Sequence, residues 1–201
     1  MNQTQRVGCW KKACFAVLMF AGLAQAQTVE RPVFQVGDQW KVETRDGWTK
    51  LPISQTDRVI TSVTDGRIEA SENGEQAIYT RDMNPVETPQ NRFEPPGKAL
   101  QFPFSAGSEW SYEGTTLIKA QGITGRSQYN VKVVGQEKVT VPSGTYDAYK
   151  LVMTGFFSTR TSTNFTRNYW YAPSARSIVK IEHISPSNQW ISEVTEVKLK
   201  P

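Results

Sequence analysis

The chain has 201 residues, of which 38% are hydrophobic and 11% aromatic, and it carries a net charge of +4. This composition is typical of a globular protein and not of a disordered one. Its single histidine and two cysteines leave too few ligands for a zinc or copper site, so we expect neither a metal nor a cofactor.

The first 26 residues have the three parts of a secretory signal peptide. Arg6, Lys11 and Lys12 form a basic region, the apolar run 16–24 follows, and Ala24-Gln25-Ala26 forms a small-x-small cleavage site. We expect segment 1–26 to be removed and the product to be periplasmic or secreted. Because no cysteine follows the apolar run, a lipoprotein is not expected, and no later segment is apolar enough to span a membrane.

Removal of this segment would also remove both cysteines and three basic residues. The remaining chain would carry 20 basic and 19 acidic side chains, for a net charge of +1. Nucleic-acid binding is therefore not expected, because it requires a clustered basic surface.

From residue 27 onward, apolar and polar residues alternate with a period of two. The alternation is clear in 129–141, 145–157, 177–184 and 191–199, and these stretches are rich in valine, threonine and aromatic residues. Asp65-Gly66 and Asn73-Gly74 are hairpin turn signals, and no helical pattern separates the strands. The sequence predicts an all-β antiparallel meander of about ten strands, which forms a curved sheet or an open barrel or sandwich.

The segment 84–100 interrupts the alternation with four prolines, and we interpret it as a linker. It would separate an N-terminal β half, 27–83, from a C-terminal β half, 101–201. FQVGDQWKVE (34–43) and FSAGSEWSYE (104–113) open the two halves with the same Phe, Gly, Trp and Glu spacing. This spacing suggests the hypothesis that the two halves are similar, each entered by a glycine turn and a tryptophan that packs at the end of the sheet.

Aromatic residues are the candidate ligand contacts. Trp110, Tyr112, Trp170 and Tyr171 would face an apolar ligand on a concave sheet surface, although packing is the commoner role of such residues. His183 follows two apolar residues on one strand face, which favours packing over catalysis. Segment 157–168 is rich in Ser, Thr and Arg, and we interpret it as a hairpin loop, with an exposed edge strand as the alternative.

The second half resembles a family of exported bacterial proteins, the TapB-like domains of unknown function. The resemblance lies in Phe102-Pro103-Phe104 through Trp110, in VPSGTYDA (141–148) and in YWYAP (169–173). Departures from the family pattern are Phe104 for Leu, Ser143 for Ala and Tyr146 for Phe. The family brings no catalytic residues that could be transferred to this chain.

These observations favour a non-enzymatic exported protein, a binding or accessory module of the bacterial cell envelope. Its partner would be an envelope protein or an apolar small molecule. One alternative is a carrier that holds an apolar or lipid-like ligand on a concave sheet face. A second is a glycan hydrolase, which would require two carboxylates facing one cleft; Glu109, Glu113 and Glu137 are scattered candidates.

Overall fold

A computed structural model describes residues 27–201, and the predicted signal segment lies outside the described residues. Twelve strands and one short 3-10 turn follow in chain order. They are β1 (Gln39–Asp46), β2 (Pro52–Val63), β3 (Ile68–Glu72), β4 (Glu75–Tyr79), β5 (Pro85–Glu87), β6 (Asn91–Glu94), β7 (Glu109–Ile118), β8 (Ile123–Val141), β9 (Gly144–Ser158), β10 (Ser162–Ala172), η1 (Pro173–Ala175), β11 (Ser177–Ile184) and β12 (Gln189–Lys198).

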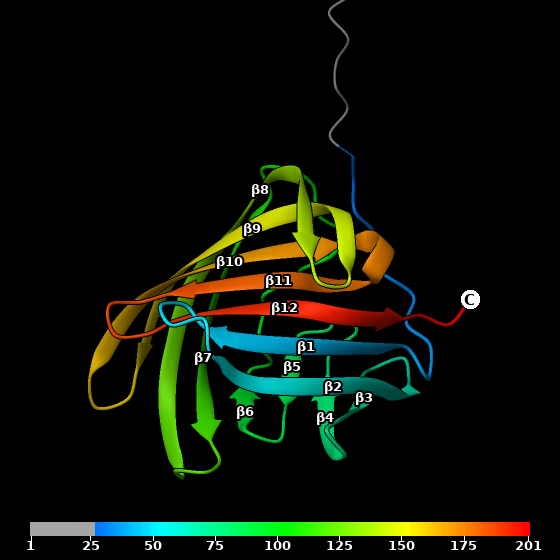
Figure 1. Cartoon of the computed structure of the whole chain (residues 1–201). Helices are drawn as coiled ribbons and strands as arrows, with labels where there is room; N and C mark the ends of the chain where they lie inside the picture. Colours follow the sequence, from blue (N-terminus) through cyan, green and yellow to red (C-terminus); the bar gives the residue numbers. More distant parts are fainter. Residues whose placement is uncertain (1–26) are drawn as a thin grey trace, which may run out of the picture.

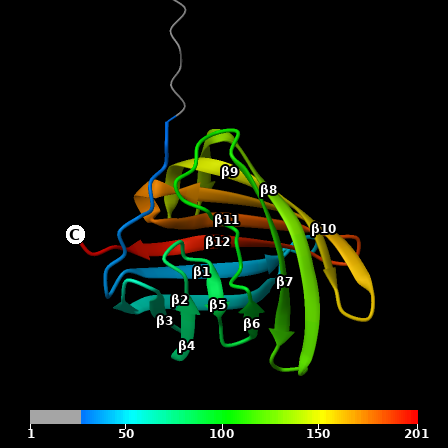
Figure 2. The same cartoon turned by 180° about the vertical axis from the view of Figure 1, so that it is seen from behind.

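The strands form a closed antiparallel barrel. Each strand pairs with the next one in the chain, and β12 pairs with β1 to complete the ring. In Figure 1, β1, β2, β11 and β12 run side by side across the front wall, and Figure 2, seen from behind, shows β7 and β8 crossing the direction of these strands at a steep angle. The predicted all-β antiparallel meander is confirmed, with twelve strands and full closure.

The segment 84–100, which the prolines marked as a linker, contributes β5 and β6 to the wall. These short strands connect β4 to β7, so residues on both sides of the segment belong to one ring. The N-terminal segment also joins the second half, because Val29 and Phe104 form an antiparallel bridge. The similarity of the two halves stays a prediction. Within residues 27–201, no helix is long and apolar enough to cross a bilayer.

The two Gly-x-x-Trp units adopt the same backbone conformation. Gly37 and Gly107 have φ angles of +89° and +86°, in the left-handed region that favours glycine. Their N–H groups donate to the carbonyls of Ile60 and Val133, both at 2.8 Å. Each turn is therefore bonded to a neighbouring strand, and the chain then enters β1 or β7.

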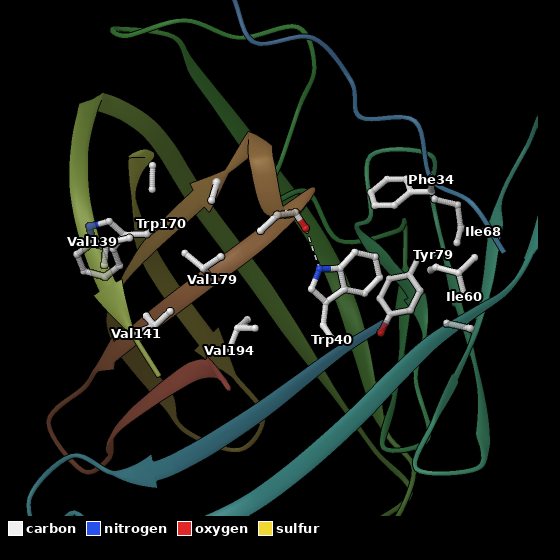
Figure 3. Packing of buried hydrophobic residues seen from close by; sticks show 14 of the residues in the cluster. Phe34, Trp40, Ile60, Ile68, Tyr79, Val139, Val141, Trp170, Val179 and Val194 are labelled. Atoms are coloured by element: carbon white, nitrogen blue, oxygen red, sulfur yellow. Dashed lines mark hydrogen bonds between the residues drawn. The ribbon is translucent and has the colours of Figure 1, made fainter. Parts of the chain in front are cut away.

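The tryptophan of each unit packs against the phenylalanine that precedes the turn. The ring centroids of Phe34 and Trp40 are 6.1 Å apart, and those of Phe104 and Trp110 are 6.4 Å apart. The indole of Trp40 is buried and donates to the carbonyl of Ala175 at 2.8 Å (Figure 3). In both places the repeated decapeptide thus forms a glycine turn that leads into a strand, with its tryptophan packed against its phenylalanine.

The long hairpin of β8 and β9 extends beyond the ring and folds back across β10 and β11 (Figure 1). A register shift between Val133 and Gly135 marks the bend. At the tip, the N–H of Ser143 donates to the carbonyl of Val194 at 3.1 Å. Val139 and Val141 from this hairpin join a core cluster with Trp170, Val179 and Val194 (Figure 3).

Candidate functional site

The barrel encloses a cavity of about 570 Å³. Its wall includes residues from the strands of both halves and from the segment 97–102, which lies between β6 and β7. Aromatic side chains are prominent in the lining, among them Tyr79, Tyr112, Tyr129, Phe165, Tyr169 and Tyr171. Pockets that bind small molecules have this size and this largely apolar character.

Strand β10 supplies one wall of the cavity through alternate residues. Phe165, Arg167, Tyr169 and Tyr171 all line the cavity, because every second side chain of a strand points to the same face. From Phe165 to Tyr171 the wall is about 20 Å long, at about 3.3 Å per residue. An elongated ligand could therefore lie along β10.

Two stacked tyrosines form part of the lining on β7 and β8. The rings of Tyr112 and Tyr129 are 4.6 Å apart with planes inclined by 19°. The hydroxyl of Tyr112 donates to the carbonyl of Pro95 at 2.8 Å, and the hydroxyl of Tyr129 accepts from the N–H of Lys98 at 2.9 Å. The loop between β6 and β7 thus fixes both rings and satisfies both hydroxyls.

Tyr171 differs from these tyrosines. Its side chain is 1% exposed and packs edge-on against Phe102 and Phe104, at centroid distances of 5.3 and 5.8 Å. Among residues 27–201, its hydroxyl is the one buried side-chain polar atom that finds no hydrogen-bond partner. Burial raises the pKa of Tyr171, so the hydroxyl stays neutral. The hydroxyl can donate and accept hydrogen bonds, and it forms neither with residues 27–201 in this apolar part of the wall.

A buried charge network lies in another part of the wall. The guanidinium of Arg58 donates to Oε1 of Glu72 at 2.8 Å from Nε, and the hydroxyl of Tyr79 donates to the same oxygen. The Arg58 Cζ lies 5.0 Å from the centroid of the Tyr79 ring. Burial raises the pKa of Tyr79, which keeps its proton available for the carboxylate. Since each member is paired, this network is already satisfied without a ligand.

A second arginine is held differently. Arg167 donates from Nε to Nδ1 of His183 at 3.0 Å, and its Cζ lies 4.8 Å from the ring centroid of Phe165 and 5.6 Å from that of Trp190. His183 stacks on Trp190, with ring centroids 5.0 Å apart. Burial and the charge of Arg167 lower the pKa of His183 to about 4, so the imidazole is neutral and accepts the hydrogen bond.

The four aromatic residues predicted as ligand contacts fall into two groups. Tyr112 and Tyr171 line the cavity, whereas Trp110 and Trp170 do not. The indole of Trp110 donates to the carbonyl of Lys98 at 2.9 Å. Trp170 donates to Oε1 of Glu137 at 2.6 Å and packs in the cluster with the β8–β9 hairpin (Figure 3). Ligand contact by these residues stays a prediction.

Several cavity residues were not singled out from the sequence. Phe165 and Arg167 lie in the segment 157–168, which forms the β9–β10 hairpin and the first part of β10. Phe165, Tyr169 and Tyr171 share one strand face, but the charged Arg167 lies on the same face and interrupts the apolar series in the sequence. Tyr129 lies in a predicted strand, but nothing in the sequence marked it as a cavity residue.

The carboxylates considered for glycan hydrolysis do not face the cavity. Glu109 and Glu113 form exposed ion pairs with Lys132 and Arg126, and Glu137 accepts from Trp170. Asp82 is the sole carboxylate that lines the cavity in the described part of the chain. The hydrolase alternative therefore gains no support. Over residues 27–201, no group of three or more His, Cys, Asp or Glu side chains could hold a metal ion.

No protein-family model matches the sequence, and no curated protein matches it either. The resemblance to the TapB-like family is therefore not confirmed. Solved structures do share the fold. A candidate lipoprotein from Parabacteroides distasonis superimposes with a TM-score of 0.58 and 12% identity, covering 84% of this chain and 98% of its own.

Two further structures agree with this. A candidate exported protein with a YmcC-like fold from Bacteroides fragilis has a TM-score of 0.55 and 14% identity over 84% of this chain and 99% of its own. The hypothetical lipoprotein YmcC from Escherichia coli has a TM-score of 0.50 and 9% identity over 81% and 84%. The chain thus has the fold of proteins described as exported or as lipoproteins. Since two of them are described as lipoproteins, the expectation that this chain is not one stays a prediction.

Proposed function

We propose that the protein is a non-enzymatic binding protein that holds an apolar or amphipathic small molecule inside its barrel. The observation that carries this proposal is the cavity of about 570 Å³ with its aromatic lining. An eight-stranded barrel is just wide enough to be filled by side chains or to hold one small ligand, and the diameter grows with strand number. This twelve-stranded barrel is wider, and residues of both core clusters line its cavity.

We place this binding role in the bacterial cell envelope. The predicted signal segment and the resemblance to TapB-like exported proteins support an exported product, and the neighbours described as exported proteins or lipoproteins have the same fold. Release of an epitope-tagged chain by osmotic shock would indicate the periplasm. Retention of the tag with the membranes after a salt wash would indicate an anchored form instead.

Binding can be measured with 1-N-phenylnaphthylamine, an uncharged apolar fluorophore whose emission rises in a dry pocket. Ser127→Phe would fill the cavity from β8, since Ser127 lines it. Gln128→Phe is the matched control, because the next residue of the strand points outward and is exposed. We expect Ser127→Phe to weaken binding at least about 10-fold, as expected when bulk replaces a ligand's apolar contacts.

The control variant should bind the fluorophore like the unmodified protein, and both variants should keep the far-ultraviolet dichroism of a β protein. Native mass spectrometry of protein purified from its host gives an independent measurement, in which bound small molecules appear as added mass. Absence of fluorophore binding together with an unliganded mass spectrum would refute the proposed function.

A further inference from the structure

The charges that line the cavity do not balance. Five residues of the lining carry a charge at neutral pH: Arg58, Asp82, Lys98, Arg167 and Arg176. Two of the arginines bind buried carboxylates, Arg58 to Glu72 at 2.7 Å and Arg176 to Asp38 at 2.9 Å. Asp82 is paired with Arg31. The excess charge of the wall is therefore positive and resides on Lys98 and Arg167.

Arg167 is the better placed of these two cations. No carboxylate among residues 27–201 forms an ion pair with it, and its one side-chain hydrogen bond in that range goes from Nε to His183. A guanidinium has five N–H donors, so the four on the two Nη atoms remain for another acceptor. The Cζ of Arg167 also lies close to two ring centroids, at 4.8 Å from that of Phe165 and 5.6 Å from that of Trp190.

This environment gives the donors a fixed direction. The hydrogen bond to His183 and the contacts with the two rings orient the guanidinium plane. A fixed guanidinium matches the two oxygens of a carboxylate or a phosphate, which can accept two parallel hydrogen bonds. Because Arg167 is partly buried, leaving its positive charge unpaired is unfavourable. An anion that enters the cavity would provide the negative charge that the protein itself does not place beside Arg167.

The wall beyond Arg167 is apolar. Tyr169 and Tyr171 follow on the same face of β10, and Tyr171 lies about 13 Å from Arg167 along the strand. Tyr171 in turn contacts Phe102 and Phe104. A cation at one position and aromatic rings along the following 13 Å suit a molecule with an acidic head and an apolar tail.

We propose that Arg167 binds the anionic headgroup, a carboxylate or a phosphate, of an amphiphile whose apolar part lies against Tyr169 and Tyr171. The inference rests on the proposed function and names its ligand class. His183, Phe165 and Trp190 act as positioning residues for the guanidinium.

The test compares probes that share one tail. Palmitate, hexadecyl phosphate and hexadecanol are titrated against the full protein in competition with 1-N-phenylnaphthylamine, and inorganic phosphate is titrated alone. We expect the two anions to bind about 10- to 100-fold more tightly than the alcohol, the range for hydrogen bonds to a charged group. Inorganic phosphate alone should not displace the fluorophore.

Arg167→Gln should reduce the affinity for both anionic probes to that of the alcohol and leave the alcohol unchanged. Arg126→Gln is the control, since Arg126 is exposed and pairs with Glu113 on the outer surface. Arg167→Lys should restore part of the preference, because it keeps the charge and loses the two-pronged geometry.

The outcomes separate the two proposals. Equal affinity of the anions and the alcohol in the unmodified protein would overturn the headgroup site and leave the proposed function intact. Binding of inorganic phosphate as tight as that of hexadecyl phosphate would overturn the amphiphile and identify a simple anion site. Failure of every tailed probe to displace a bound fluorophore would overturn the amphiphile and leave the proposed function intact, whereas absence of fluorophore binding together with an unliganded mass spectrum would refute the proposed function itself.

Discussion

Asp38 is the residue whose replacement should reveal most about how the barrel is held together. Its side chain is 0% exposed and accepts hydrogen bonds from the N–H of Gln35 at 3.0 Å, from the N–H of Lys200 at 2.7 Å and from Nη1 of Arg176 at 2.9 Å. It therefore joins the turn before β1 to the chain after β12 and to the residue that follows η1.

The second Gly-x-x-Trp unit contains a natural replacement for this aspartate. At the equivalent position, the hydroxyl of Ser108 accepts from the N–H of Ser105 at 3.0 Å. Asp38→Ser should consequently keep the turn hydrogen bond and remove the other two. Removing one member of a buried ion pair costs about 3–5 kcal/mol. Because the side chain of Arg176 is 23% exposed and can reach water, we expect a loss at or below the lower end of this range, about 2–3 kcal/mol.

Urea unfolding followed by tryptophan fluorescence would measure this loss. A double-mutant cycle with Arg176→Met isolates the ion pair, and its coupling free energy should be at least about 1 kcal/mol. Ser108→Ala serves as the control in the second unit and should cost about 1 kcal/mol, the value of one neutral hydrogen bond. A loss below about 0.5 kcal/mol for Asp38→Ser, or strict additivity in the cycle, would refute the assigned role of Asp38.

Three further predictions follow from other buried positions. The pKa of His183 is lowered from 6.5 to about 4, so as the pH falls the unfolded chain binds a proton before the folded chain does. The free energy of unfolding should therefore decrease between pH 6.5 and 4, by up to about 3 kcal/mol. Urea titrations at pH 7 and 4.5 measure this decrease, and His183→Gln should abolish it. Gly155→Ala should destabilise by more than about 2 kcal/mol in the same assay, because its Cβ would lie 2.1 Å from the carbonyl oxygen of Gln128; a neutral effect would contradict the close approach of β8 and β9. Tyr171→Phe should leave the unfolding free energy unchanged or raise it, since the hydroxyl has no partner among residues 27–201; a loss of more than about 1 kcal/mol in thermal or urea unfolding would show that the hydroxyl is satisfied.

Local patterns in the sequence were sufficient to predict the hairpins. Asn73 and Gly74 have φ angles of +53° and +90°, and they connect β3 to β4 as the Asn-Gly signal predicts. The strands that were missed, β5 and β6, are three and four residues long. Runs of this length between prolines contain too few residues to show alternation.

Closure of the barrel could not be predicted in this way. The pairing of β1 with β12 joins residues from opposite ends of the chain, for example Gln39 with Lys198. Periodicity reports which face of a strand is apolar but not which distant strand lies beside it. The sequence therefore predicted a curved sheet or an open barrel or sandwich, and the closure by β1 and β12 appeared only in the structure.

The positions of individual residues in the candidate site also could not be predicted from periodicity. Trp170 and Tyr171 are consecutive in β10, and neighbouring residues of a strand point to opposite faces, so both could not be expected to line the cavity. Trp110 shares a strand face with Tyr112 but lies nearer the end of the barrel, against Phe104. Trp110 instead donates to the carbonyl of Lys98, in a segment between β6 and β7 whose position the sequence pattern does not specify.

The pairing of the first strand with the last also bears on how fast the protein folds. β1 can pair with β2 as soon as both have been made, but its other edge finds a partner only when β12 arrives. Folds dominated by such distant pairings fold in milliseconds to seconds, more slowly than folds built from local contacts. During that interval the free edge of β1 can pair with another chain. The interval before β12 pairs with β1 is therefore the period in which this protein is most prone to aggregate.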